Sequence, residues 1–411
     1  MIIYLGSAQM ISNVARIIGG LLVASIIIPK LYGIFTGIGI VIGYLPILLF
    51  GVMNGLNREL PFCLGRGERN KAMDYASVVQ FWELGLSIIS FSFLTFISIY
   101  YLFQTNYIFA AGFFTYALSS VHYFYGINYL SILYRTNNDF NKLSNILLIS
   151  AAVSFVSILL VWKWQFYGLC IRAILTSVVE LYFFWKWRPF SVVPKWDLQI
   201  LKEVLKVGFP IFTVGLVSTL WATLQNTFVL KFGGAEQFGL FALAVMIENS
   251  MGIIETSVSH VIYPKMAFEY GAGKGVKELL KISLKPILFS FFVLLFSIAA
   301  GWYLIPFFVE WLLPKYIGGI EAARWTLFLL LASILGVNNS IFNVLKKQKD
   351  YLISLLIGIF AFIVLLVVLY YENGFSLVIF PQSMLFGKII QLVIGYFYIS
   401  KYYRKSQELT R

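Results

Sequence analysis

The segment Tyr351–Tyr370, YLISLLIGIFAFIVLLVVLY, carries no charged side chain. A helix of about 20 apolar residues is long enough to cross the ~30 Å hydrocarbon core of a bilayer. Lipid offers no hydrogen bonds, so only a helix or a closed barrel can satisfy its backbone there. This stretch is therefore predicted to be a membrane-spanning helix.

About twelve stretches of this kind, each roughly 20 residues or longer, follow one another along the chain. The predicted spans are Ile2–Ile28, Ile34–Leu56, Ser77–Phe103, Tyr107–Leu133, Leu143–Trp162, Gly168–Trp185, Val207–Leu230, Leu240–Tyr263, Pro286–Val309, Ala322–Leu345, Tyr351–Tyr370 and Phe375–Ser400. The gaps between them are short, which makes consecutive spans antiparallel neighbours. We therefore expect an all-α polytopic membrane protein with little mass left for a soluble domain.

The composition supports the membrane class. Hydrophobic residues make up 60% of the chain and charged residues only 12%, whereas a soluble domain carries about 25% charged residues. The two cysteines, Cys63 and Cys170, provide neither a disulfide framework nor a metal-ligand spacing. The N-terminus is apolar from Ile2 but lacks a basic leading region, and Arg16 interrupts it, so we expect a retained first helix rather than a signal peptide.

The basic residues are distributed unevenly among the gaps. This distribution predicts the orientation of the protein in the membrane. Of the 31 Lys and Arg residues, 23 fall in the gaps of one face, 5 in the gaps of the other and 3 inside spans. The basic face is expected to be cytoplasmic, because positive loops stay inside. The protein should therefore lie in the cell membrane with both termini in the cytoplasm. The same distribution explains the net charge of +13 without a nucleic-acid partner.

The two halves of the chain resemble each other. Gly65–Lys71 follows the second span and Gly271–Lys277 follows the eighth, and both have the pattern G-x-G-x3-K in a gap of the basic face. We interpret this as a duplication of six spans. The predicted domains are an N-terminal lobe at 1–190, a cytoplasmic amphipathic linker at 191–206 and a C-terminal lobe at 207–411.

The sequence contains little from which to build an enzyme. His122 and His260 are the only histidines, and we expect both to form hydrogen bonds between helices. No Asp-x-Asp motif and no Walker lysine motif occurs, and Gly65 and Gly67 lack the third glycine of a dinucleotide fingerprint. The outward gaps are too short for a catalytic domain. We therefore predict that the chain is not an enzyme and holds no metal.

Polar side chains lie in stripes along single faces of the predicted spans. Ionisable residues at membrane depth usually face a bundle interior or a wet cavity. The stripes contain Gln9, Asn13 and Arg16; Gln80 and Glu83; Arg172, Thr176 and Glu180; Gln225 with Asn226; Glu248 with Glu255; and Lys388 with Gln391. Such stripes in both halves predict a central polar cavity between two six-helix lobes. For the charged members, snorkelling to the membrane surface or a structural ion pair remains the alternative.

Two segments carry a resemblance to a known family. Asn54–Ala72, NGLNRELPFCLGRGERNKA, is similar to the loop after the second span of the polysaccharide-unit (O-antigen type) flippases. Leu313–Arg324, LPKYIGGIEAAR, resembles the segment that leads into their tenth span. These flippases belong to the multidrug/oligosaccharidyl-lipid/polysaccharide exporter superfamily. Many of them have fourteen spans, whereas about twelve are predicted here.

The resemblance implies a flippase that moves an undecaprenyl-diphosphate-linked oligosaccharide between the membrane leaflets by alternating access. Its partners would be this polyprenyl-diphosphate-linked oligosaccharide, membrane lipids and other polysaccharide assembly proteins, and no cofactor is expected apart from a coupling H⁺ or Na⁺. The substrate-binding residues would be Arg16, Lys388, Arg172, Asn13, Gln9, Gln225 and Asn226. The ion-coupling residues would be Glu248, Glu255, Glu83 and Glu180.

Three other functions stay open at this point. A multidrug exporter of the same superfamily would need acidic groups for cationic drugs and would have little use for Arg16 or Lys388. A membrane polymerase or glycosyltransferase that acts on the same lipid carrier would need a large or acidic outward loop. A structural scaffold would leave the buried charges unexplained.

Overall fold

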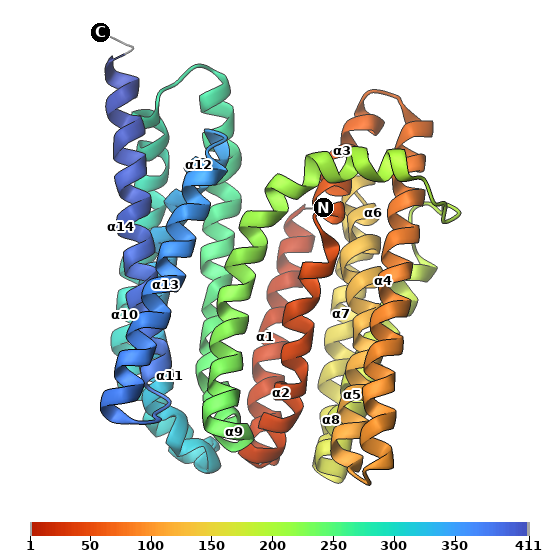
Figure 1. The fold of residues 1–411 in the computed structure, drawn as a ribbon, viewed down its shortest axis with the longest axis vertical. Helices are drawn as coiled ribbons and strands as arrows, with labels where there is room; N and C mark the ends of the chain where they lie inside the picture. The colour runs from red at the N-terminus through yellow and green to blue at the C-terminus, as the bar shows by residue number, and fades with distance from the viewer. Residues whose placement is uncertain (1, 409–411) are drawn as a thin grey trace. The chain divides into compact units, whose positions relative to one another are not determined.

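The computed structural model describes residues 2–408, without the side chains of residues 2–6, 250–257, 260, 261, 264, 267, 271 and 405–408. Every regular element in this part of the chain is a helix (Figure 1). The chain divides into two compact units, Met1–Leu216 and Val217–Arg411. The predicted all-α membrane class with two helical units is thereby confirmed.

The first unit contains the shorter and more interrupted helices. Its elements are α1 (Ile2–Ile26), α2 (Pro29–Tyr44), η1 (Leu45–Leu49), α3 (Val52–Gly65), α4 (Arg69–Phe103), α5 (Tyr107–Val121), η2 (His122–Leu130), α6 (Ser131–Thr136), α7 (Phe140–Val156), α8 (Ile158–Lys186) and the beginning of α9 (Leu198–Gly271). Helix α4 packs on α5, and α1 packs on α7. Its main apolar core is formed by α3, α4 and η2 together with Leu201 and Val204 of α9.

The second unit continues α9 and adds five further α-helices. These are α10 (Val276–Leu312), α11 (Ile320–Gly336), α12 (Ser340–Val344), α13 (Gln348–Asn373) and α14 (Ile379–Glu408), and two short 3-10 helices, η3 (Pro314–Gly319) and η4 (Val337–Asn339), precede α11 and α12. Helix α13 packs on α14, and α11 packs on both α10 and α14. Large apolar side chains such as Phe296 and Phe397 are exposed on the outer faces of these helices, as expected of surfaces that face lipid.

Within the described residues, nine helices are long and apolar enough to cross a membrane. The other predicted spans are present but interrupted or merged. The fourth is divided among α5, η2 and α6, and α7 contains 17 residues before a break at Ser157. The seventh and eighth run together in α9, where Gly234 has a non-helical conformation (φ 72°). Each predicted span therefore corresponds mostly to helix, and the second one is also broken, by positive φ at Phe50 and Gly51 between η1 and α3.

Two pairs of turns repeat between the units. In the turn after α3, the amide groups of Arg66, Gly67 and Glu68 donate to the carbonyl groups of Phe62, Leu64 and Cys63. After α9, the amide groups of Ala272, Gly273 and Lys274 donate in the same order to those of Phe268, Tyr270 and Glu269. The second glycine of each G-x-G motif has a positive φ, 77° at Gly67 and 83° at Gly273, where glycine has no steric penalty.

A second pair of turns strengthens the repeat. The amide groups of Asn138 and Asp139 donate to the carbonyl groups of Arg135 and Tyr134, and those of Lys346 and Lys347 donate to Asn343 and Phe342. Asn138 and Lys346 both have positive φ, 58° and 56°. The matched turns follow the second and eighth predicted spans and the fourth and tenth, as a duplication of six spans requires.

The segment that was predicted as a linker begins α9. Leu198 starts a helix that continues without interruption into the seventh predicted span, and Figure 1 shows this helix bending after its first turns. Leu201 and Val204 are buried in the core of the first unit. Tyr75 of α4 donates a hydrogen bond of 2.8 Å to Glu203. The structure thus places residues 198–206 with the first unit, and the predicted domain limits at 190 and 207 stay a prediction.

Candidate functional site

The first unit contains a polar cavity of about 580 Å³, here called the first-unit cavity. Helices α1, α6, α7 and α8 and the π-helix η2 surround it. Its lining contains Gln9, Ser12, Arg16, His122, Ile127, Asn128, Ser131, Arg135, Leu143, Leu147, Ser150, Ala151, Ser154, Thr176, Glu180 and Phe184. Three of the predicted site residues, Gln9, Arg16 and Glu180, are therefore brought together.

An irregular helix forms one wall of the first-unit cavity. Residues His122–Leu130 are wound as a π-helix, η2, between the α-helices α5 and α6. The side-chain amide of Asn128 donates to the carbonyl oxygen of Tyr123 at 2.9 Å, which satisfies part of the rearranged backbone. π-Helical turns inside α-helices are rare and frequently occur at functional sites. Here the wider turn places His122 and Asn128 in the cavity lining.

Helices α7 and α8 are joined across the cavity wall by two serines one turn apart. The Ser150 hydroxyl donates to a carboxylate oxygen of Glu180 at 2.6 Å. The Arg172 guanidinium donates to the carbonyl oxygen of Ser154 at 2.8 Å and to its hydroxyl at 2.7 Å. The two charges of the predicted Arg172–Glu180 stripe thus each bind a serine of α7 and do not pair directly.

Glu180 also lies beside a histidine. Its carboxylate is 3.7 Å from Nε2 of His122, and the two side chains are 13% and 9% exposed. Nε2 of His122 has no hydrogen-bond partner among the described residues. A carboxylate, an imidazole and a serine hydroxyl in one cavity wall form a group that can take up and release a proton.

Arg16 extends from α1 into the same cavity. Its guanidinium donates to the hydroxyl of Ser12 at 3.2 Å, and no described carboxylate of this unit lies within ion-pair distance of it. Arg135 lines the cavity as well, where it binds the hydroxyl of Ser131 at 3.3 Å. Since Glu180 is the one acid in the described lining, the cavity carries an excess of positive charge.

The second unit contains a smaller cavity of about 230 Å³, here called the second-unit cavity. Its lining contains Ser218, Ala222, Glu248, Leu294, Leu329, Leu330, Ser333, Ile334, Met384 and Lys388. Two predicted charges of opposite sign, Glu248 on α9 and Lys388 on α14, thus share one mostly apolar space. The arrangement can hold either an internal charge pair or a small ion.

An aromatic ring lies against Lys388. Its ammonium group is 4.6 Å from the centroid of the Trp221 ring, at the distance of a cation–π contact. Trp221 is fully buried, and a Cβ atom added at either Gly358 or Gly387 would lie 2.9 Å from its ring. The two glycines therefore make room for the indole between α13 and α14. Sequence reasoning placed Lys388 near mid-span but not beside this ring.

Several predicted site residues lie outside both cavity linings. Asn13 and Asn226 are partly buried, and Gln225 is buried with its side-chain carbonyl unpaired among the described residues. Glu83 is 0% exposed on α4, and neither of its carboxylate oxygens has a hydrogen-bond partner in the described part of the chain. The side chain of Glu255 lies outside the described residues. The roles proposed for all of these stay predictions.

Sequence reasoning did not identify Ser150, Ser154 and Arg135 as cavity residues. The two serines stand one helical turn apart in a predicted span, so their shared face was readable from the spacing. Their partners on α8 were not, because a contact between two helices depends on how the helices are rotated. Arg135 was assigned to a gap because the predicted fourth span ends at Leu133, whereas helix α6 continues to Thr136.

The helical membrane fold with a polar cavity in each unit is typical of a polytopic transporter. A profile of the polysaccharide biosynthesis protein family matches residues 22–296, which is more than half of the chain. The protein therefore belongs to this family. Comparison with the curated proteins finds no significant match.

Solved structures of transporters share the fold. An inward-facing multidrug resistance MATE family transporter of the MOP superfamily is similar over 100% of this chain and 99% of its own, with a TM-score of 0.77 and 16% identity. An outward-facing MATE transporter covers 98% and 94%, with a TM-score of 0.66 and 17% identity. A MOP superfamily transporter from Pyrococcus furiosus covers 97% and 92%, with a TM-score of 0.63 and 17% identity. At these identities the likeness establishes the fold alone.

Proposed function

We propose that this protein is a flippase that translocates a polyprenyl-diphosphate-linked oligosaccharide from the cytoplasmic to the outer leaflet of the cell membrane. The observation that carries the proposal is Arg16, which lines the first-unit cavity without an ion-pair partner among the described acids of its unit. A charge at the bilayer centre costs at least ~2.5–3.5 kcal/mol. An anionic cargo would offset that cost during transport.

The chemistry of the cargo suits the first-unit cavity. A diphosphate offers several anionic oxygens, and the guanidinium group binds phosphate with two parallel hydrogen bonds. Arg16 and Arg135 line the cavity, and Arg172 reaches its wall through Ser154. The serine hydroxyls and the amide groups of Gln9 and Asn128 can bind sugar hydroxyls. The long polyprenyl tail can stay in lipid while the polar head crosses.

The transport cycle would be driven by H⁺ or Na⁺ through alternating access of the two units. Glu180 is the best-placed coupling residue, because it touches Ser150 and lies 3.7 Å from Nε2 of His122 within the cavity wall. Proton uptake there would change the charge that a diphosphate meets. Glu248 in the second-unit cavity is the second candidate, and contact with other polysaccharide assembly proteins would deliver and receive the cargo.

Multidrug export is the second candidate function, and the MATE relatives favour it. Cationic drugs need acidic side chains, whereas the first-unit cavity has two arginines and one glutamate in its described lining. For the Pyrococcus furiosus transporter, reverse polarity of the binding pocket suggests a different function. The same physical reasoning favours an anionic cargo here.

Transport of a defined probe tests the proposal. Purified protein is reconstituted into vesicles with undecaprenyl diphosphate that carries a short glycan labelled with a dye, and a membrane-impermeant quencher reports the dye in the outer leaflet. We expect the wild type to render nearly all of the dye quenchable. Arg16→Ala should lower the rate of probe translocation at least tenfold. Arg16→Lys should retain part of that rate, because lysine keeps the charge but not the paired hydrogen bonds.

A matched variant controls for the loss of one positive charge. Arg58 is 65% exposed at its side chain and lies outside the cavity, so Arg58→Ala should transport at the wild-type rate. Efflux of ethidium from the same vesicles tests the competing function. Ethidium efflux by the wild type without any probe movement would overturn the flippase proposal in favour of drug export.

A further inference from the structure

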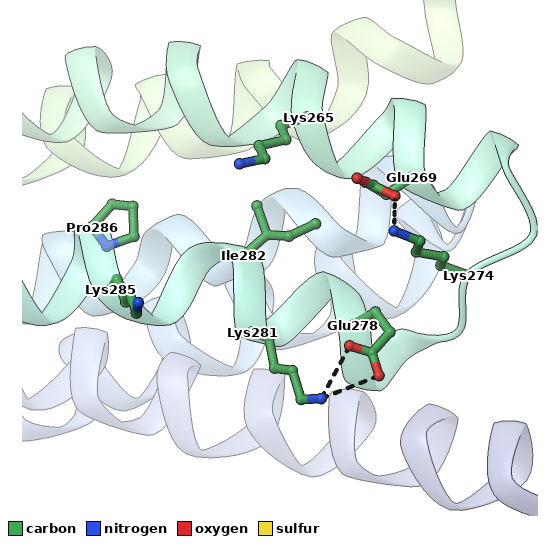
Figure 2. Close-up of a pocket in the computed structure, with 8 residues that line it drawn as sticks. All are labelled: Lys265, Glu269, Lys274, Glu278, Lys281, Ile282, Lys285 and Pro286. Carbon is green, nitrogen blue, oxygen red and sulfur yellow. Dashed lines mark hydrogen bonds and ion pairs between the residues drawn. The ribbon is translucent and has the colours of Figure 1, made fainter.

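A pocket of about 430 Å³ lies between the end of α9 and the beginning of α10, apart from both cavities (Figure 2). Here it is called the α9–α10 pocket. It is lined by Lys265, Glu269, Lys274, Glu278, Lys281, Ile282, Lys285 and Pro286. Four lysines and two glutamates give the pocket a net positive charge. None of these residues takes part in the transport mechanism proposed above.

Two of the lysines are neutralised within the pocket. The ammonium group of Lys274 is 2.5 Å from Glu269, and that of Lys281 is 3.2 Å from Glu278 (Figure 2). Both acids are therefore engaged. No described carboxylate pairs with Lys265 or Lys285, which extend from α9 and α10 beside Pro286 and Ile282 (Figure 2). These two exposed ammonium groups are the available charges of the pocket.

The position of Lys285 relative to the predicted ninth span indicates the kind of ligand. The predicted ninth span begins at Pro286, so we expect Lys285 to stand where α10 (Val276–Leu312) enters the apolar layer. Phe289, Phe292 and Phe296 follow at i+4, i+7 and i+11 on the same face as Lys285. They are 73%, 63% and 78% exposed. A strip of exposed phenylalanine side chains thus begins one helical turn after Lys285.

We infer that the α9–α10 pocket binds the phosphate head group of an anionic membrane lipid, whose acyl chains lie along the Phe289–Phe296 strip. A phosphate accepts charge-assisted hydrogen bonds from ammonium groups, and clusters of lysine next to a spanning helix attract anionic lipids. The strip favours a lipid over free phosphate, because free phosphate has nothing to place against it. This inference does not depend on the cargo of the transporter.

Native mass spectrometry of the purified full-length protein tests the site without any glycan substrate. Phosphatidylglycerol, phosphatidylcholine and inorganic phosphate are added separately, and the bound fraction is measured. We expect saturable binding of phosphatidylglycerol only. The double variant Lys265→Gln with Lys285→Gln should bind it about 30-fold more weakly, since each lysine near a membrane surface contributes about a fivefold effect.

Glu278→Gln provides a change in the opposite direction. It releases Lys281 from its ion pair, so phosphatidylglycerol should bind about fivefold more tightly. A gain in affinity cannot result from misfolding, which keeps the test decisive even if the double variant is unstable.

The control removes the same amount of charge elsewhere. Lys349 and Lys401 are exposed in the same unit and lie on the face predicted to be cytoplasmic. Lys349→Gln with Lys401→Gln should bind phosphatidylglycerol as the wild type does. An equal loss in this control would show that overall surface charge, and not the α9–α10 pocket, attracts the lipid. Equal binding of phosphatidylcholine, or of inorganic phosphate, would likewise overturn the assignment.

Discussion

At the scale of single residues, the contact between Lys388 and Trp221 shows how the bundle accommodates a charge. The ammonium group lies 4.6 Å from the centre of a ring that is fully buried. A desolvated cation–π contact contributes about 2 kcal/mol, which is of the same order as the cost of inserting a lysine. Glu248 lines the same cavity and can balance the remaining charge. The two residues should therefore behave as one unit.

A double-mutant cycle tests this coupling. We expect Lys388→Gln and Glu248→Gln each to lower the free energy of unfolding by about 1–3 kcal/mol, because each leaves an opposite charge in an apolar space. The double variant should lose clearly less than the sum, with an interaction energy between about 0.5 and 3 kcal/mol. Thermal unfolding of the four purified proteins measures it.

The reference for this cycle pairs Glu248 with a distant lysine. Glu248→Gln combined with Lys349→Gln should give additive losses, since Lys349 is exposed outside the cavity. If the losses for Glu248→Gln and Lys388→Gln are also additive, the two residues are not coupled. If the pH dependence of the transport rate disappears in Glu248→Gln while the free energy of unfolding is unchanged, Glu248 would instead be assigned to ion coupling.

Helical spacing alone brings two predicted site residues of α1 into one cavity but not Asn13, which lies between them and outside the lining. Gln9 and Arg16 lie seven residues apart on α1 and line one cavity, as their helical spacing predicts. The contacts between helices were beyond reach. Glu180 binds Ser150 across 30 positions of sequence, and such a contact depends on the rotation of both helices, which hydropathy does not determine.

At the scale of elements, α3 and α9 of the first unit cross in close contact at glycine residues. This contact is here called the glycine crossing. Gly51, at the N-terminus of α3, and Gly55 within it lie against Val204 and Gly208 of α9 so closely that a Cβ atom on Gly208 would overlap the Gly51 carbonyl oxygen. Gly51 also has a positive φ of 91°, which a larger residue would adopt only with strain. The crossing holds the first turns of α9 against α3.

Gly208→Ala should therefore destabilise the protein. The added methyl group meets backbone atoms, which cannot rotate away, and overpacking of this kind costs about 1–3 kcal/mol. We expect the midpoint of thermal unfolding to fall by about 1–4 °C, measured by tryptophan fluorescence in detergent. Gly215→Ala is the matched control on the same helix, because a Cβ atom there meets open space.

The control should leave the midpoint unchanged or raise it slightly, since alanine favours helix over glycine by about 1 kcal/mol. Similar midpoints for Gly208→Ala and the wild type would mean that the crossing relaxes at little cost.

The same scale shows where hydropathy fails to describe a helix. Its average over a span is insensitive to a local change of pitch, so the π-helix at His122–Leu130 was not foreseen within the fourth span. The break at Gln165, with a φ of 47°, falls in a gap that was predicted, because Lys163 and its neighbours interrupt the apolar run. Breaks marked by polar residues are thus predictable, and breaks inside apolar runs are not.

At the scale of the whole molecule, the repeated turns make the two units comparable. The turns around Gly67 and Gly273 share three backbone hydrogen bonds in the same order, and the turns around Asn138 and Lys346 share another pattern. The short glycine motif predicts the first pair of turns because glycine adopts a positive φ without steric penalty, and the duplication of six spans stays a prediction. The relative movement of the two units stays a prediction, which a crosslink between these equivalent turns can test.

We expect a crosslink between Arg66→Cys and Lys274→Cys to stop translocation of the labelled lipid, because alternating access requires the two units to move. Both side chains are exposed, 61% and 51%, and therefore accessible to a bismaleimide linker with a reducible disulfide. The native thiols should react slowly, since Cys63 and Cys170 are buried and burial raises the pKa of the Cys63 thiol. Reduction of the linker should restore the rate.

The decisive control places both cysteines within one unit. Arg66→Cys with Lys71→Cys spans a single turn of the first unit, so its crosslink should leave the translocation rate unchanged. If the crosslink within one unit also stops transport, transport depends on the turn itself. The loss of transport could then not be attributed to blocked movement between the units. If the pair between the units is fully crosslinked and the dye still crosses the membrane at the wild-type rate, alternating access between the units is wrong. The mechanism would then have to operate within one unit, where the first-unit cavity already holds Arg16 and Glu180 together.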